Sequence, residues 1–278
     1  MDSSPTITIS EYELETVHEF TYLGSTIADS LHLESELNKR IGKAATTMNR
    51  LKKRAWSNNK LTEHTKVQIY KACVLSTLLY GSETWTMHAH HEKRLNVFHM
   101  RQLRFILNIT WQDKTSNKAI LHKANIPSMF TLLKQRRLRW LGHVIRMVDG
   151  RIPKDLLYGE LAEGTRPSGR PHLRYKDICK RDLVALDIGL DTWETTARDR
   201  DEWRHAITES LLGFETKLHA HSELKRAQKK ARMDQNQGLT SQFICGKCGR
   251  DCKSRIGHYS HSRRCKGNGD RDVPHHEP

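Results

Sequence analysis

The chain lacks the two sequence features that direct a protein into or across a membrane. It contains no run of about 18 consecutive apolar residues, the length that a membrane-spanning helix needs. Its N-terminus also has no charged start followed by an apolar stretch, as a signal peptide would have. The sequence therefore predicts an intracellular protein, in the nucleus or the cytoplasm, with no membrane partner.

The usual local signatures of catalysis are also missing. No two Asp residues are adjacent, no Gly-rich phosphate loop is present, and Gly81-Ser82-Glu83 lacks the second Gly of a nucleophile elbow. The densest acidic cluster, at 199–202, shares its predicted helix with several Arg residues, which favours a salt-bridged face. The tract of His88, His90 and His91 opens another predicted helix and is typical of solvent-facing side chains. These absences favour binding over catalysis.

Positive charge is what the sequence has in excess. It carries 47 Lys and Arg against 32 Asp and Glu, a formal net charge of +15, and its 36% hydrophobic content with six Trp can support a core. Lys and Arg gain free energy when they neutralise phosphates and release counterions. The composition therefore indicates a folded protein whose leading candidate partner is DNA or RNA.

The second informative feature is a cluster of cysteines near the C-terminus. Its spacing, Cys-x2-Cys-x12-His-x3-Cys, is typical of a ββα zinc finger that holds Zn²⁺ in a tetrahedron. The expected ligands are Cys245, Cys248, His261 and Cys265. Two positions that usually hold the Phe and Leu of a finger core are Cys252 and His258 here, and because both can bind zinc, either could replace a member of the quartet. Cysteines clustered in this way suit a reducing compartment and a metal better than disulfides.

Hydrophobic periodicity predicts a mainly α-helical chain that follows a short β segment. Residues 7–23 alternate with breaks near Ser10 and Glu19, which predicts two or three short strands and a small β-hairpin. From Leu31 the apolar residues recur every three or four positions, as on one face of a helix. Residues 159–172, rich in Gly and Pro, are predicted to form a loop. Helices are predicted over 31–51, 62–81, 89–108, 115–123, 129–148, 173–186 and 191–233, the last broken near Gly213.

Basic residues collect on two of these helices, on the loop between them and in the finger. Arg contacts to phosphate position a protein without reading sequence, so weak sequence preference is expected. The alternative for Arg137 and Arg139 is pairing with carboxylates of neighbouring helices, and Trp140, although suited to base stacking, has apolar neighbours typical of core. The expected nucleic-acid contacts are Arg136, Arg137, Arg139, Arg146, Arg166, Arg170, Arg174, Lys176, Arg250, Lys253 and Arg255.

Four strings in order give the chain a family resemblance. They are Phe-Thr-Tyr-Leu-Gly-Ser at 20–25, Leu-Tyr-Gly-Ser-Glu-Thr-Trp at 79–85, Arg-Leu-Arg-Trp-Leu-Gly-His-Val-Ile-Arg-Met at 137–147 and Gly-Arg-Pro-His-Leu-Arg-Tyr-Lys-Asp at 169–177. Together they resemble the C-terminal part of the endonuclease and reverse transcriptase polyproteins of LINE-like non-LTR retrotransposons. The resemblance implies a primer-grip β-hairpin at 1–30, a thumb-like helical bundle at 31–112 and a basic helical post-thumb region at 113–215. A basic arm or linker at 216–240, the zinc finger at 241–268 and a disordered tail at 269–278 are expected to follow.

The same resemblance sets the functional expectation. Reverse transcriptases carry their metal-binding carboxylates upstream of the primer grip, and this chain has neither those residues nor the nuclease domain. We therefore expect no enzyme, but a zinc-containing, nucleic-acid-binding remnant of a reverse transcriptase whose partner is retroelement RNA or target DNA. The alternatives are a structural or protein-interaction module with incidental charge, and a translated relic without a selected function.

Overall fold

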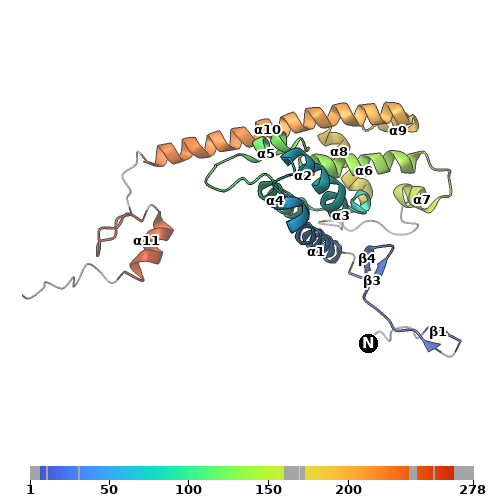
Figure 1. The fold of residues 1–278 in the computed structure, drawn as a ribbon, viewed down its shortest axis with the longest axis horizontal. Coiled ribbons are helices and arrows are strands. Elements are labelled where there is room, and N and C mark those ends of the chain that lie inside the picture. The colour runs from blue at the N-terminus through green and yellow to red at the C-terminus, as the bar shows by residue number, and fades with distance from the viewer. Residues whose placement is uncertain are drawn as a thin grey trace, which may run out of the picture. The chain divides into compact units, whose positions relative to one another are not determined.

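The chain is mainly helical, with small β-hairpins at its N-terminus, as the change of periodicity near Leu31 predicts (Figure 1). The computed structural model describes residues 7–10, 12–30, 32–159, 169, 173–237, 243–252 and 254–265. The chain forms two compact units, Met1–His219 and Ala220–Pro278. No helix among the described residues is long and apolar enough to cross a lipid bilayer.

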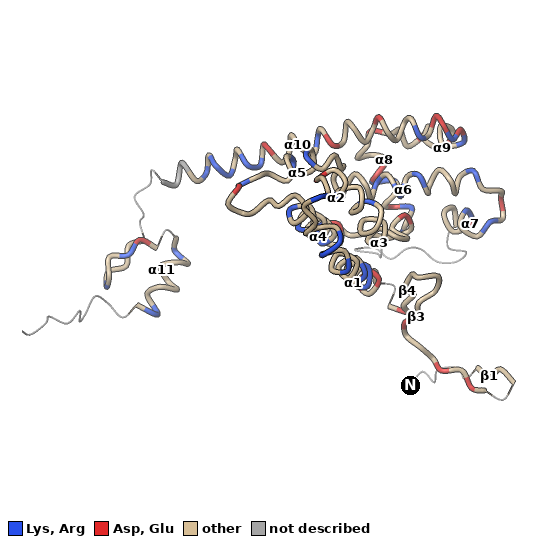
Figure 2. Tube along the Cα trace, viewed as in Figure 1, with Lys and Arg blue, Asp and Glu red and all other residues tan. Residues whose placement is uncertain are grey.

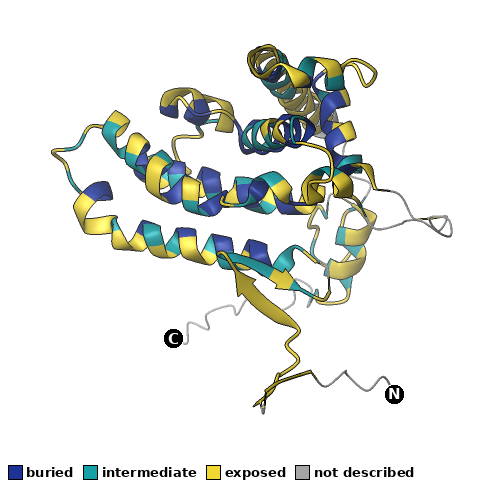
Figure 3. Ribbon diagram, turned by 90° about the vertical axis from the view of Figure 1, so that its right-hand side faces the viewer, coloured by how far each residue is buried: buried dark blue, intermediate teal, exposed yellow. Residues whose placement is uncertain are grey.

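The N-terminal segment forms two antiparallel hairpins instead of one. Strands β1 (Thr8–Ile9) and β2 (Tyr12–Glu13) make the first, and β3 (Glu19–Tyr22) and β4 (Ser25–Ala28) make the second. The second hairpin turns at Leu23 and Gly24, whose φ angles are +47° and +83°. Positive φ at both positions is the geometry of a tight turn whose twist matches that of the paired strands. The strands are largely exposed (Figure 3).

Polar side chains cap two of the helices of the first unit. Thr62 caps α2 by accepting the backbone N–H of Thr65, and Ser128 caps α6 by accepting the backbone N–H of Thr131. The helical elements up to α6 are α1 (Glu34–Arg50), η1 (Lys52–Trp56), α2 (Glu63–Ile69), η2 (Tyr70–Leu75), α3 (Ser76–Leu78), η3 (Ser82–Thr84), α4 (Ala89–Ile106), α5 (Asn117–Ala124) and α6 (Met129–Ile145). The elements η1 and η2 are π-helical turns, which the periodicity does not predict.

The second half of the chain adds α7 (Ile152–Tyr158), α8 (Tyr175–Ala185), α9 (Trp193–Arg198), α10 (Arg200–Gln237) and α11 (Arg255–Ser262). The predicted break near Gly213 is wrong, because α10 runs through that position. The break lies instead at Asp199, whose carboxylate accepts the backbone N–H groups of Asp201 and Glu202, both at 2.8 Å. A side chain that accepts the first free N–H groups of a helix marks where that helix starts. A single Gly inside a helix does not end it when the rest of the helix is packed.

Helix α6 belongs to both apolar cores of the first unit. Its first half supplies Met129 and Leu133 to a cluster that begins at Leu37, and its second half supplies Leu138 and Leu141 to a cluster built with α7, α8, α9 and α10. In Figure 3 buried positions, in dark blue, recur along the helices between exposed ones. Arg137, which lies between the two apolar halves of α6, is therefore fully buried.

Candidate metal centre and basic surfaces

The finger is a short β-turn structure followed by α11. Ile244 and Asp251 form an antiparallel bridge, and the backbone N–H of Cys245 donates to the carbonyl of Arg250 at 2.9 Å. Gly249 closes the knuckle by donating its N–H to the carbonyl of Cys245 at 2.8 Å, with φ at +69°, a conformation that Gly adopts without a steric penalty. Ser254 then starts α11 by accepting the N–H of Gly257.

This local structure brings the four expected ligands together. The Sγ atoms of Cys245, Cys248 and Cys265 and a ring nitrogen of His261 all lie within 4.8 Å of one another. The Cys248 Sγ and the His261 Nε2 are 3.1 Å apart. A zinc ion bound by thiolates at about 2.3 Å in a tetrahedron needs ligand atoms roughly 3.8 Å apart, so this group can close around such an ion with small adjustments.

The chemistry of the donors also fits a metal ion. The backbone N–H groups of Lys247 and then Cys248 lower the pKa of the Cys245 thiol to about 6, and the thiolate is the form that binds zinc. Cys245 is buried, while Cys248, His261 and Cys265 are partly buried. A bound Zn²⁺ would join the knuckle to α11 and act as a structural site, because four protein ligands leave no open position for a substrate.

Two further potential ligands, Cys252 and His258, lie outside this group of four. The Cys252 thiol contacts the carbonyl of Arg250 at 3.6 Å. The side chains of Cys252 and His258 are partly buried. Burial is the main reason that the pKa of the Cys252 thiol is raised. The raised pKa favours the protonated thiol over the metal-binding thiolate.

A second group that could hold a metal joins α1 and the start of α4. Glu34 Oε1 lies 3.1 Å from His91 Nε2 and 3.3 Å from His90 Nε2. His91 Nδ1, however, accepts the backbone N–H of His88 at 3.2 Å, so the ring proton sits on Nε2 and points at the carboxylate. A metal-bound imidazole needs the opposite arrangement, in which the other nitrogen donates. Arg94 also binds Glu34, and the group is therefore an ion-paired helix start.

The prediction that this His tract faces solvent is confirmed for His88 and His90, which are exposed, and is wrong for His91. His91 is 4% exposed because its ring forms the capping box of α4. Burial, followed by the charge of His90, lowers the pKa of His91 and keeps the ring neutral.

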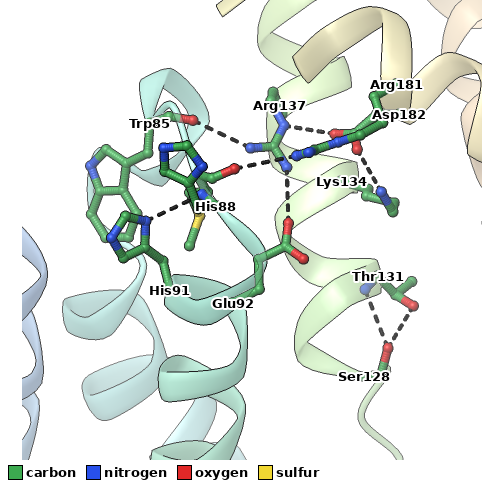
Figure 4. Close-up of polar contacts among 11 residues, drawn as sticks. Trp85, His88, His91, Glu92, Ser128, Thr131, Lys134, Arg137, Arg181 and Asp182 are labelled. Atoms are coloured by element: carbon green, nitrogen blue, oxygen red, sulfur yellow. Dashed lines mark hydrogen bonds and ion pairs between the residues drawn. The ribbon is translucent and has the colours of Figure 1, made fainter. Parts of the chain in front are cut away.

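The largest correction concerns Arg137, which the sequence places on a nucleic-acid surface. Its side chain has no exposed area, and its Nε donates to Asp182 Oδ2 at 2.7 Å (Figure 4). A second nitrogen donates to the carbonyl of Trp85 at 3.3 Å. Asp182 also accepts from Lys134 Nζ at 2.5 Å. A side chain enclosed in this way cannot contact a nucleic acid, so the alternative, a carboxylate partner on a neighbouring helix, holds for Arg137.

The other arginines of α6, and Arg146 at its C-cap, differ in their contacts. Arg136 donates to the carbonyl of Leu79 at 3.2 Å and lies 3.8 Å from Glu83, while Arg146 donates to the carbonyl of Ala197 at 2.5 Å. Arg139 is exposed, and no ion pair joins it to another described residue. Most of the positive charge expected on α6 is thus used to connect helices.

The start of α8 offers a smaller basic surface than expected. Arg174 is exposed but lies 3.9 Å from Asp177, and Lys176 is partly buried with its Nζ 5.6 Å from the centre of the Tyr158 ring. In the finger, Arg250 and Arg255 are exposed. The remaining expected contacts, Arg166, Arg170 and Lys253, lie outside the described residues.

One further basic surface lies in the segment predicted to be a basic arm or linker. The C-terminal half of α10 carries exposed Lys and Arg residues, and Figure 2 shows them spaced along the helix. The periodicity of a helix places them on one face, which the sequence analysis did not consider.

Comparison with known proteins finds a similar protein of transposon origin. No protein-family model matches the chain, and no solved structure matches it. A Caenorhabditis elegans protein described as transposon-derived is 28% identical over 208 residues, which cover 71% of this chain and 73% of that protein. The chain is therefore similar, over most of its length, to a protein of transposon origin.

Proposed function

We propose that this chain is a zinc-containing, nucleic-acid-binding protein that descends from the reverse transcriptase polyprotein of a LINE-like retrotransposon. The observation that carries the proposal is the group formed by Cys245, Cys248, His261 and Cys265, whose ligand atoms lie within 4.8 Å of one another. The similarity to a transposon-derived protein supports the origin. The net charge of +15 supports a polyanionic partner.

The proposal is binding, not polymerisation or cleavage. Among the described residues, the groups of three or more potential ligands are the Cys3His cluster and the ion-paired group at Glu34. Neither supplies the paired carboxylates that hold two metal ions in phosphoryl transfer. The Cys3His cluster has no free coordination position, so zinc would stabilise the finger and not activate a substrate.

The metal part of the proposal is tested with cobalt, which gives a visible spectrum in a tetrahedral thiolate site. The full chain should bind one Co²⁺ per molecule, and Zn²⁺ should displace it. Cys248→Ser should abolish the signal, and the matched variant Cys252→Ser should retain it, because Cys252 lies outside the group of four. Retention of the signal in Cys248→Ser together with its loss in Cys252→Ser would contradict the ligand assignment.

The nucleic-acid part is tested by measuring the affinity of the zinc-loaded chain for mixed-sequence DNA and RNA as salt is varied. Each neutralised phosphate contributes about 0.9 to the slope of log affinity on log salt for duplex DNA. A steep slope with weak sequence preference is expected. A slope near zero would instead favour the alternative function, a protein-interaction module in which the charge is incidental.

A further inference from the structure

One face of the C-terminal half of α10 is unlike the other basic surfaces of the molecule. The buried stripe that holds α10 against the second core consists of Trp203, Ile207 and Leu211, and no residue from 220 to 233 is buried. From 220 to 233 the helix presents its side chains to solvent. Its basic face is formed by Lys225, Arg226, Lys229, Lys230 and Arg232, all of them exposed.

The geometry of an α-helix gathers these five side chains. At 100° and 1.5 Å per residue, they fall within an arc of about 160° and along roughly 10 Å of the axis. Neither a hydrogen bond nor an ion pair joins any of the five to another described residue. The arginines of α6 differ, since Arg136, Arg137 and Arg146 are each bound to another helix or to η3 or its flanking loops.

The free helix carries an electrostatic penalty on this face. Lys225 and Lys229 are four residues apart, as are Arg226 and Lys230, and like charges at that spacing each destabilise a helix by a few tenths of a kcal/mol. The residues themselves are strong helix formers, which explains why the segment is helical without burial. A polyanion on this face would remove the repulsion and stabilise the helix.

We propose that the basic face of α10 binds duplex DNA by lying in the major groove and contacting phosphates on its walls. This inference rests on the proposed nucleic-acid-binding function and names the partner and the surface. The five cations match a polyanion, and the major groove of B-form DNA is wide enough to admit an α-helix. Contacts would go to the backbone, so little sequence preference is expected.

Other polyanions fit this face less well. Single strands are bound by aromatic side chains on which bases stack, and no Phe, Tyr or Trp occurs between 215 and 233. Duplex RNA has a deep, narrow major groove that a helix does not enter. An anionic membrane would need a broad apolar face, whereas the opposite side of this helix consists of Ala220, Leu224, Ala227 and Ala231, a single large apolar residue among three small ones.

The test compares two variants of the full, zinc-loaded chain that change the net charge equally. The arm variant replaces all five residues of the basic face with Gln, which keeps the helix propensity nearly unchanged. The control variant replaces five exposed cations of α1 and η1 with Gln, namely Lys43, Arg50, Lys52, Lys53 and Arg54. Circular dichroism verifies that both variants keep the native helix content.

Binding is measured by fluorescence anisotropy with a DNA duplex of roughly two helical turns, between about 50 and 200 mM salt. The arm variant should lose about three units of salt slope, which corresponds to roughly a 10³-fold loss of affinity near 0.1 M salt, because the counterion term vanishes near 1 M. The control variant should keep its slope within about one unit of the native value. A charge-retaining variant, with Lys225, Lys229 and Lys230 changed to Arg, should bind as the native chain does.

Several outcomes would overturn the inference. Equal losses in the arm and control variants would show an effect of net charge alone, and an arm variant that binds like the native chain would show that this face makes no contact. A larger loss for duplex RNA, single strands or anionic vesicles than for duplex DNA would assign a different partner. If the native chain itself has a flat salt slope, the proposed function fails as well, which separates that failure from failure of this surface alone.

Discussion

Replacing Asp182 with Asn tests the claim that Arg137 is a structural residue. In the native fold the Asp182 carboxylate is fully buried and accepts from both Arg137 and Lys134. Asparagine keeps the shape and removes the charge, so two cations remain without their shared anion. Arg137 has no exposed area through which water could compensate it. Glu92, at 3.9 Å from Arg137, is too far for a direct hydrogen bond, and burial raises its pKa.

The expected cost follows from the physics of buried charge. Removing one partner of a buried ion pair costs about 3–5 kcal/mol, because the other charge is left without solvation or a partner. Lys134 is slightly exposed and can reach water in part, so we expect about 4 kcal/mol for Asp182→Asn. That is a large share of the roughly 5–15 kcal/mol that stabilises an ordinary domain, so the variant will be close to unfolding.

Urea denaturation followed by circular dichroism measures this cost, and a charge-balanced variant keeps the test informative. Arg137→Met combined with Asp182→Leu removes both members of the pair and leaves only the slightly exposed Lys134 without its partner, so it should recover much of the lost stability. This folded double variant should also bind nucleic acid with the native salt slope. Lys134→Met, which leaves the Arg137 pair intact, should cost less than Asp182→Asn.

Two results would refute the reasoning. If Asp182→Asn costs less than about 1 kcal/mol, the pair behaves like an exposed surface bridge and Arg137 is not enclosed. If the folded double variant loses about one unit of salt slope, Arg137 contacts a phosphate, and the original interpretation from the sequence is correct.

Three further predictions follow from close contacts and buried groups. Gly142→Ala should destabilise the first unit by about 1–3 kcal/mol in the same urea assay, because the new Cβ would lie 2.2 Å from the buried Trp203 ring of α10. Gly213→Ala should instead stabilise it by about 0.5–1 kcal/mol, because a Cβ at that position has no atom within 4 Å. Burial lowers the pKa of His99 from 6.5 to about 4, so the unfolded state binds the proton more tightly than the folded state does. The free energy of unfolding should therefore fall by about 3 kcal/mol as pH decreases from 6.5 to 4, and His99→Gln should remove that dependence. Glu215 accepts from the backbone N–H of Ser128 at 3.2 Å and from its hydroxyl at 3.1 Å, so Glu215→Ala should cost about 1–3 kcal/mol, and a thermal midpoint equal to the native one would contradict this role.

The parts of the fold that could be predicted are those set by local chemistry. The start of α2 at Thr62 follows from a side chain that caps a helix three residues ahead, and the start of α4 follows from apolar spacing. The Cys3His group follows from ligand spacing, because a knuckle and a helix end fix four donors within a short segment.

The parts that could not be predicted depend on partners distant in the sequence. Arg137 reads as a surface cation until Asp182, 45 residues away, is placed beside it. The continuity of α10 at Gly213 depends on packing against the second core. The helix starts after Asp199 because that side chain caps it, but from sequence alone the same Asp could equally form a salt bridge within a helix. Periodicity identifies which face is apolar, but it does not identify which charge is buried with it.

The four strings that give the chain its family resemblance are connected to one another by hydrogen bonds. The Tyr80 hydroxyl of the second string donates to the carbonyl of Leu23 in the first, at 3.0 Å. Arg137, which opens the third string, donates to the carbonyl of Trp85 in the second. Tyr175 of the fourth string donates to the carbonyl of Arg137 at 3.4 Å. Each string therefore holds its neighbour in place through a side chain that reaches a backbone carbonyl.

This arrangement separates the evidence for ancestry from the evidence for function. A side chain that satisfies a carbonyl of a distant segment is constrained by the fold, whatever the protein binds, because the carbonyl would otherwise lose its partner. The strings accordingly support a shared architecture, and they identify no binding surface. The basic face of α10 and the thiols of the finger lie outside all four strings, and no hydrogen bond or ion pair joins the five cations of that face to another described residue. Function should therefore be sought in those two segments, which contain none of the four strings.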